Sequence, residues 1–143
     1  MNGRDFLDTA RHLAGRGGEA DGRSAVSRAY YAAFHVARDL LTALRFRVPR
    51  ADRAHNYLYV RLNNCGEPHV ENAAFRPDNL RGLRNHADYD VRRPMAPNSV
   101  PDAVADAELI VQILDALSPA EVTRVTDAMK LYEHRIGDVT WHP

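Results

Sequence analysis

The sequence predicts an all-α protein, an up-and-down bundle of four or five helices. Three observations favour this class. Apolar side chains recur every three or four residues over long stretches, which is the period of a helix that packs on one side. Residue pairs typical of helix N-termini occur at three places. No segment alternates polar and apolar residues for long enough to predict a β-strand.

The central helix of this bundle is predicted at residues 24–45. This stretch contains no glycine or proline and is rich in alanine and leucine, which favour helix. One predicted face consists of Val26, Tyr30, Ala33, Ala37, Leu40 and Leu44. Further apolar residues widen that face, so we expect this helix to be buried on most of its circumference.

Other helices are expected before and after it. Asn2, with Asp5 three residues later, predicts a capped first helix that ends at the glycine-rich run 15–18. A further helix is predicted at residues 51–64. Apolar residues show no clear period over residues 67–76, so we expect this segment to be a connection between two helices.

The second half of the chain predicts three more helices. The first runs from Pro77 to about Val91 and is followed by a loop with two prolines. Residues 99–102 and 118–121 each have the pattern of a capping box, which predicts a helix after each. We expect one domain at residues 1–136 and a C-terminal tail at residues 137–143.

The composition is that of an ordinary globular chain, with 45% hydrophobic and 27% charged residues. The single cysteine, Cys65, predicts no internal disulfide. No apolar run approaches the ~20 residues that span a bilayer. We therefore expect a cytoplasmic protein with no membrane partner.

Charge is unevenly distributed although the formal net charge is zero. Residues 38–93 hold eleven arginines against seven acids, whereas residues 99–143 hold eight acids against three bases. This asymmetry fits either solvated helix faces of different sign or a basic groove for a phosphate-bearing ligand.

Familiar catalytic and metal-binding patterns do not occur. There is no glycine-rich phosphate loop, no paired-cysteine zinc spacing and no His-Glu-x-x-His, so we predict no metal and no cofactor. The chemistry is instead expected in residues 81–90, which gather two arginines, an asparagine, a histidine, two aspartates and a tyrosine. Arg84 and Asp88 are four residues apart and predict an ion pair along the helix. Such a pair suits a phosphate site, but it also occurs on ordinary surfaces.

Two segments together carry a resemblance to a known family. SRAYYAAFHVARDLL at residues 27–41, followed by LRNHADYD at residues 83–90, resembles the prokaryotic HEPN domains over about residues 1–118. The resemblance implies a helical bundle that usually dimerises. It also implies metal-independent ribonuclease activity in many members, often as a toxin paired with a nucleotidyltransferase antitoxin or as a defence nuclease.

The ribonuclease members carry an arginine followed four to six residues later by a histidine. Arg81 and His86 satisfy this spacing, whereas Arg84 is followed by the polar Asn85 that commonly accompanies the arginine, so which arginine pairs with His86 stays open. The resemblance implies Arg84, His86 and Arg81 as catalytic residues. Asn85, Asp88 and Tyr89 are expected to orient these groups or to bind RNA, as are Tyr31 and His35 if they face the same cleft.

In such a ribonuclease the 2′-hydroxyl of RNA attacks the adjacent phosphate, and His86 serves as the general base or acid. Two rival hypotheses remain. One is a non-catalytic HEPN module that binds a nucleotide or a nucleotidyltransferase through the same residues. The other is a helical dimerisation domain whose arginine-rich segment is only a solvated face.

Overall fold

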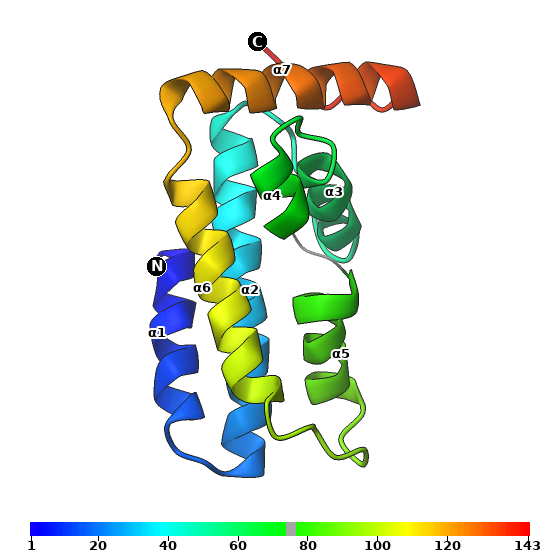
Figure 1. Ribbon diagram of the computed structural model, residues 1–143. Coiled ribbons are helices and arrows are strands. Elements are labelled where there is room, and N and C mark those ends of the chain that lie inside the picture. The colour runs from blue at the N-terminus through cyan, green and yellow to red at the C-terminus, as the bar shows by residue number, and fades with distance from the viewer. Residues whose placement is uncertain (74–76) are drawn as a thin grey trace.

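The structure is a computed structural model that describes residues 1–73 and 77–143, and it confirms the all-α class. The described residues form seven α-helices and one π-helical turn. They are α1 (Gly3–Ala14), α2 (Glu19–Ala43), α3 (Arg53–Leu62), α4 (Pro68–Ala73), the turn η1 (Pro77–Arg81), α5 (Gly82–Tyr89), α6 (Ser99–Asp115) and α7 (Pro119–Ile136). Figure 1 shows α1, α2, α5 and α6 roughly parallel to the long axis of the molecule, while α7 lies across one end.

The predicted central helix is confirmed as α2, which contacts α1, α3, α5 and α6. Its apolar side chains, among them Val26, Tyr30 and Leu41, are buried in the main core. The helix begins at Glu19, five residues before the predicted start. Gly22 lies inside this first part, and a Cβ there would come within 3.0 Å of Val100 on α6, so a glycine permits the close approach.

The first helix begins as predicted. Asn2 accepts from the Arg4 amide, and Asp5 accepts from the Asn2 amide, which together make the expected capping box. The next residue, Gly3, is buried against α2, where an added Cβ would lie only 2.7 Å from the Cβ of His35. Glycine is therefore needed where α1 meets α2.

Three local predictions are corrected. Residues 67–76 were expected to connect, but the structure places α4 at Pro68–Ala73; residues 74–76 lie outside the described part. The helix expected from Pro77 to Val91 is divided, because Asn79 has a non-helical backbone (φ −96°, ψ −111°) and α5 begins only at Gly82. A capping box does not form at residues 99–102, because Ser99 is already inside α6 and the Asp102 amide donates to the carbonyl of Asn98.

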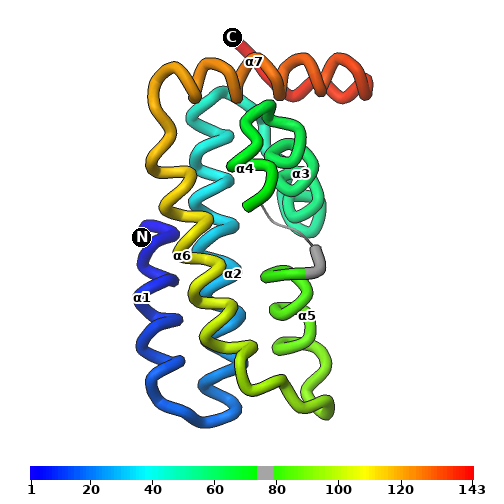
Figure 2. Tube along the Cα trace, in the orientation of Figure 1, coloured from blue at the N-terminus to red at the C-terminus, as the bar shows by residue number. Residues whose placement is uncertain are grey.

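The last helix, α7, begins at the predicted capping box of Ser118 and Glu121. Figure 2 shows the chain turning sharply before α7, so that this helix lies across one end of the bundle, where it contacts α3. Gly137 ends it in the left-handed conformation (φ 71°), which glycine adopts without strain. None of the described helices has both the length and the apolar character needed to cross a bilayer.

Residues 137–143, the predicted tail, are held by a carboxylate on α7. Glu133 is fully buried and accepts hydrogen bonds from the backbone amides of Thr140 and Trp141, both 2.9 Å long. It also pairs with the buried guanidinium of Arg61 on α3, with Nη2 at 3.0 Å. Trp141 then forms an isolated β-bridge with Phe46. The tail is thus tied to both α7 and the end of α2.

These contacts set the pKa of Glu133. Burial alone raises it, but the hydroxyl and amide of Thr140, the amide of Trp141 and Arg61 all donate to the ionised form, so the pKa lies below its ordinary value. A carboxyl whose pKa is lower in the folded chain contributes stability above its unfolded pKa, about 4.3. That contribution is lost as the pH falls through the folded pKa.

We predict that Glu133→Gln lowers the free energy of unfolding at neutral pH by about 3 kcal/mol, because it leaves Arg61 buried without its charged partner. The variant should also lose less stability than the wild type between about pH 6 and pH 3. Urea unfolding followed by circular dichroism across this range measures both effects. Glu108→Gln, which removes a surface ion pair with Arg11, is the control and should cost under about 1 kcal/mol. Equal costs for the two substitutions would contradict the role of Glu133.

Candidate functional site

The candidate site is built around the guanidinium of Arg84 on α5, whose side chain is only 12% exposed. Its Nε donates to Asp88 Oδ2 at 3.0 Å, which confirms the predicted ion pair along the helix. Its Nη2 donates to the hydroxyl of Tyr31 on α2 at 2.7 Å. Two different helices therefore fix the plane of this guanidinium.

Two exposed side chains cover the outer edge of the same guanidinium. Nη1 donates to Asn85 Oδ1 at 3.2 Å, and Nη2 also donates to the hydroxyl of Tyr89 at 3.1 Å. Asn85 is exposed, and Tyr89 is 72% exposed although it is a large aromatic residue. Neither partner is held by burial, so an incoming ligand can replace them.

Aromatic rings surround the cation. The Cζ of Arg84 lies 5.1 Å from the ring centre of Tyr31, 5.0 Å from that of Tyr89 and 5.7 Å from that of Tyr30. Rings at these distances attract a cation through their electron-rich faces. We call Arg84, Asp88 and the rings of Tyr30, Tyr31 and Tyr89 the Arg84 cluster. Arg28 on α2 extends it, because its guanidinium lies 5.5 Å from the Tyr31 ring.

Asp88 is oriented from α2 as well. The hydroxyl of the buried Ser27 donates to Asp88 Oδ2 at 3.1 Å, the same oxygen that accepts from Arg84. Ser27 is the first residue of the segment 27–41 that resembles a known family. That segment thus contains a residue that positions the Asp88 carboxylate as well as residues of the core.

A second arginine, Arg23 on α2, holds the C-terminal end of α5. Its guanidinium is almost fully buried, and its Nη1 donates to the carbonyls of His86, Ala87 and Asp90 at 3.2 to 3.3 Å. Its Nη2 donates to the carbonyls of the following loop, at Val91 and Arg93. A cation at a helix C-terminus satisfies carbonyls that lack an intrahelical partner. Sequence reasoning missed this residue, since nothing local to Arg23 indicates where its side chain ends.

His86, a predicted catalytic residue, is turned away from Arg84. Its Nε2 hydrogen-bonds with the carbonyl of Arg93 at 3.0 Å, and among the described residues the structure gives its ring no hydrogen bond to the Arg84 cluster. Residues two apart on an α-helix point about 200° apart, so one face of α5 cannot present both side chains.

Arg81 and His35, two other predicted site residues, lie at the edges of the cluster. Burial raises the pKa of Tyr30 and lowers that of His55, and the charge of Arg81 opposes the first shift and adds to the second, so Arg81 lies within electrostatic range of both rings. His35 stacks on Phe6 of α1 with the ring centres 5.5 Å apart, and its burial lowers the pKa of its imidazole. The ring of Tyr31 lies 6.2 Å from that of His35, so the predicted pair does meet, though on the α1 side of the site.

His55 on α3 belongs to the cluster although sequence reasoning did not select it. Its Nδ1 shares a hydrogen bond with the hydroxyl of Tyr30, and the two rings are stacked 5.6 Å apart. Burial lowers its pKa most, and the charges of Arg81 and Arg84 lower it further, so all three favour the neutral imidazole. Burial also raises the pKa of Tyr30 to about 12. No short motif links α3 to α5, which is why spacing could not reveal His55.

Comparison with known proteins supplies one finding. A family model described as the HEPN domain matches residues 2–117, which covers the chain from α1 to the end of α6. No curated protein and no solved structure gives a significant match. The matched region contains the whole Arg84 cluster and excludes α7.

We predict that Arg23→Met destabilises the protein by about 3 kcal/mol, because it leaves several buried carbonyls without a donor. Relative to the wild type, Arg23→Met should also speed hydrogen exchange at the amides of α5 more than at those of α1. Urea unfolding and hydrogen exchange by mass spectrometry measure these effects. Arg38→Met is the control, because Arg38 is on the same helix but partly exposed. Protection of α5 that is unchanged in Arg23→Met would contradict its role as the cap.

Proposed function

Because the chain belongs to the HEPN domain family, we propose that its Arg84 cluster binds the phosphate groups of RNA or of a nucleotide. The observation that carries this proposal is the fixed guanidinium of Arg84. Asp88 and Tyr31 hold its inner side, while among the described residues its outer edge hydrogen-bonds only to the exposed Asn85 and Tyr89. A planar, pre-oriented guanidinium suits two oxygens of a phosphate, and less side-chain entropy is lost when it is already held.

Binding would begin with replacement of the two exposed partners. Phosphate oxygens would accept from Nη1 and Nη2 in place of Asn85 and Tyr89. Tyr89, once released, offers a 72% exposed aromatic ring on which a base can stack. Charge favours an anion as well, because Arg28 and Arg81 lie near the same rings and Asp88 offsets only one positive charge.

Metal-independent cleavage of RNA is the second candidate function. Two histidines support it. His55 offers an imidazole near Arg84 whose pKa is lowered by burial and by the neighbouring arginines, and the half-buried His86 lies two residues from Arg84 on the other side of α5. A base would take the proton of the 2′-hydroxyl as its oxygen attacks phosphorus. An acid would protonate the leaving 5′-oxygen, and the product would end in a 2′,3′-cyclic phosphate.

The orientation of His86 favours binding over cleavage as the main proposal. In a single chain its Nε2 already has the Arg93 carbonyl as a partner, away from the guanidinium that would hold the phosphate. Cleavage through His86 would require its ring to turn, or a second copy of the chain to present its own His86 at this cluster.

We keep a homodimer and a nucleotidyltransferase partner as proposals. The exposed Tyr89 and Val91 at the end of α5 support them, since large apolar side chains at the surface suit a protein contact. A toxin or defence role and a cytoplasmic location belong to the same proposal. A co-expressed nucleotidyltransferase that relieves growth arrest caused by this protein would support the toxin role.

We predict that Arg84→Gln weakens the binding of a short fluorescent single-stranded RNA by at least ~10-fold, because a charged phosphate contact contributes about 1.5–3 kcal/mol. Fluorescence anisotropy at fixed salt measures the affinity, and unlabelled ATP as competitor tests whether a free nucleotide occupies the same site. Arg135→Gln on α7 is the matched control and should bind like the wild type. Equal affinities for all three proteins would overturn the proposed site.

The second candidate function, RNA cleavage, makes its own prediction. Wild-type protein should cut a mixed RNA substrate in the presence of EDTA, and Arg84→Ala should reduce the rate about 100-fold or more. The ends of the products are identified by mass spectrometry as 2′,3′-cyclic phosphates. His55→Ala and His86→Ala, compared separately, show which imidazole moves the proton, while His12→Ala on α1 serves as the control. RNA that is bound by the wild type but never cut would reject this second candidate and leave the binding function intact.

A further inference from the structure

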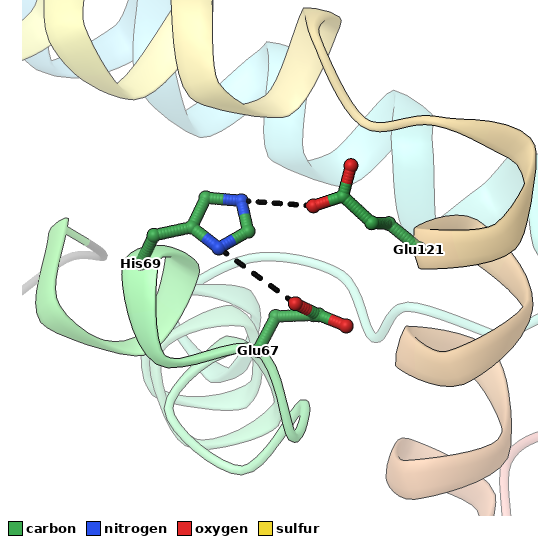
Figure 3. A group of neighbouring side chains, drawn as sticks. All are labelled: Glu67, His69 and Glu121. Atoms are coloured by element: carbon green, nitrogen blue, oxygen red, sulfur yellow. Dashed lines mark ion pairs between the residues drawn. The ribbon is translucent and has the colours of Figure 1, made fainter.

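Three side chains of types that can bind a metal ion, Glu67, His69 and Glu121, meet where α4 approaches α7, away from the Arg84 cluster. Figure 3 shows the imidazole of His69 between the carboxylates of Glu67 and Glu121. Its Nε2 lies 3.3 Å from Glu121 Oε2, and its Nδ1 lies 3.7 Å from Glu67 Oε2. One ligand atom from each residue lies within 4.8 Å of the others. Folding thus brings Glu121 to Glu67 and His69, which lie more than fifty positions earlier in the sequence.

Donors outside the group orient both carboxylates. The Nε of Arg124 donates to Glu67 Oε1 at 2.7 Å, and the backbone amide of Ser118 donates to Glu121 Oε1 at 3.1 Å. Each carboxylate therefore has one oxygen fixed by a neighbour and presents the other, Oε2, to His69. Metal sites commonly hold their ligands through outer hydrogen bonds of this kind.

We propose that Glu67, His69 and Glu121 bind a divalent transition-metal ion of the Zn²⁺ type. Two carboxylates balance the charge of the ion, and a neutral imidazole nitrogen favours Zn²⁺ over Mg²⁺ or Ca²⁺, which prefer oxygen ligands alone. Tetrahedral zinc with bonds near 2.1 Å has ligand atoms about 3.4 Å apart. His69 Nε2 and Glu121 Oε2 already have this spacing at 3.3 Å. Glu67 Oε2 lies against Nδ1, the other ring nitrogen, so it would have to move toward Glu121 to reach an ion on Nε2. Water would fill the remaining position beside the half-exposed His69.

The site has a structural role distinct from the proposed function. Glu67 and His69 lie within residues 2–117, which match the family model, but Glu121 on α7 lies beyond them, so the match does not cover the complete site. An ion there would join α7 to the start of α4. Glu133 and Arg61 already hold the other end of α7, so the ion would give this helix a second anchor.

The test is titration of the full chain with Zn²⁺ by isothermal titration calorimetry at about pH 7.5, where histidine is mostly neutral. We expect one Zn²⁺ per chain, a higher melting temperature with Zn²⁺ and little effect of Mg²⁺. His69→Gln and Glu121→Gln should each weaken binding at least ~10-fold. Glutamine at position 121 preserves the capping box with Ser118, so this variant removes the charged ligand without removing the cap.

Exposed histidines elsewhere provide the control, because they also attract zinc. His12→Gln on α1 should bind Zn²⁺ like the wild type. The absorption spectrum of added Co²⁺ gives a second readout, since bands in the visible region report on the geometry of bound ligands and should be lost in His69→Gln. The proposal is overturned if the wild type binds no Zn²⁺, or if His69→Gln and Glu121→Gln bind it as tightly as the wild type. In either case the three residues form an ion-paired cluster only.

Discussion

The candidate site depends on how α2 holds α5. Helix α5 has only eight residues, follows a π-helical turn and buries just one residue, Ala87. A helix so short is not stable alone, and its apolar contacts are few, because only Ala87 is buried while Leu83 packs against the core half-exposed. Arg23 adds a polar contact, because its buried guanidinium satisfies carbonyls at the C-terminal end of α5. Ser27 and Tyr31, one and two turns further along α2, then bind the Asp88–Arg84 pair. A single helix thus positions both the backbone and the functional side chains of the site.

Buried charge is used in complementary ways at the two ends of the molecule. Near α5 a buried cation, Arg23, donates hydrogen bonds to carbonyl oxygens, whereas at α7 a buried anion, Glu133, accepts hydrogen bonds from backbone amides. Ions removed from water are tolerated only when polar groups surround them, and each of these contacts joins segments distant in sequence. The hydrogen bonds of Arg23 and Glu133 are directional, so they favour one placement of α5 and one of the C-terminal tail. Apolar packing alone would define these placements less strictly. Figure 1 shows α5 and α7 apart from each other, so the proposed binding site and the α7 end are separate.

The sequence predicted what depends on near neighbours. The apolar face around Tyr30, the capping boxes at Asn2 and Ser118, and the Arg84–Asp88 pair all follow from spacings of three or four residues, and all are confirmed. The roles of Arg23 and His55 could not be predicted, because their partners lie more than twenty residues away and become neighbours only on folding. The short α4 has a single buried side chain, Val70, and so leaves no apolar period to detect.

The position of His86 distinguishes phosphate binding from RNA cleavage, two functions that the sequence predicted for the same residues, 81–90. Holding a phosphate requires a fixed cation, which Arg84 provides together with Asp88 and Tyr31. Cleaving next to that phosphate also requires a group that moves protons within hydrogen-bond reach of it. Within one chain His86 faces the carbonyl of Arg93, while His55 lies on the aromatic side of the cluster and its Nδ1 is engaged by Tyr30. The fold of a single chain is therefore organised to bind a phosphate first. Catalysis would follow only where a rearrangement, or a second chain, brings an imidazole to the bound group.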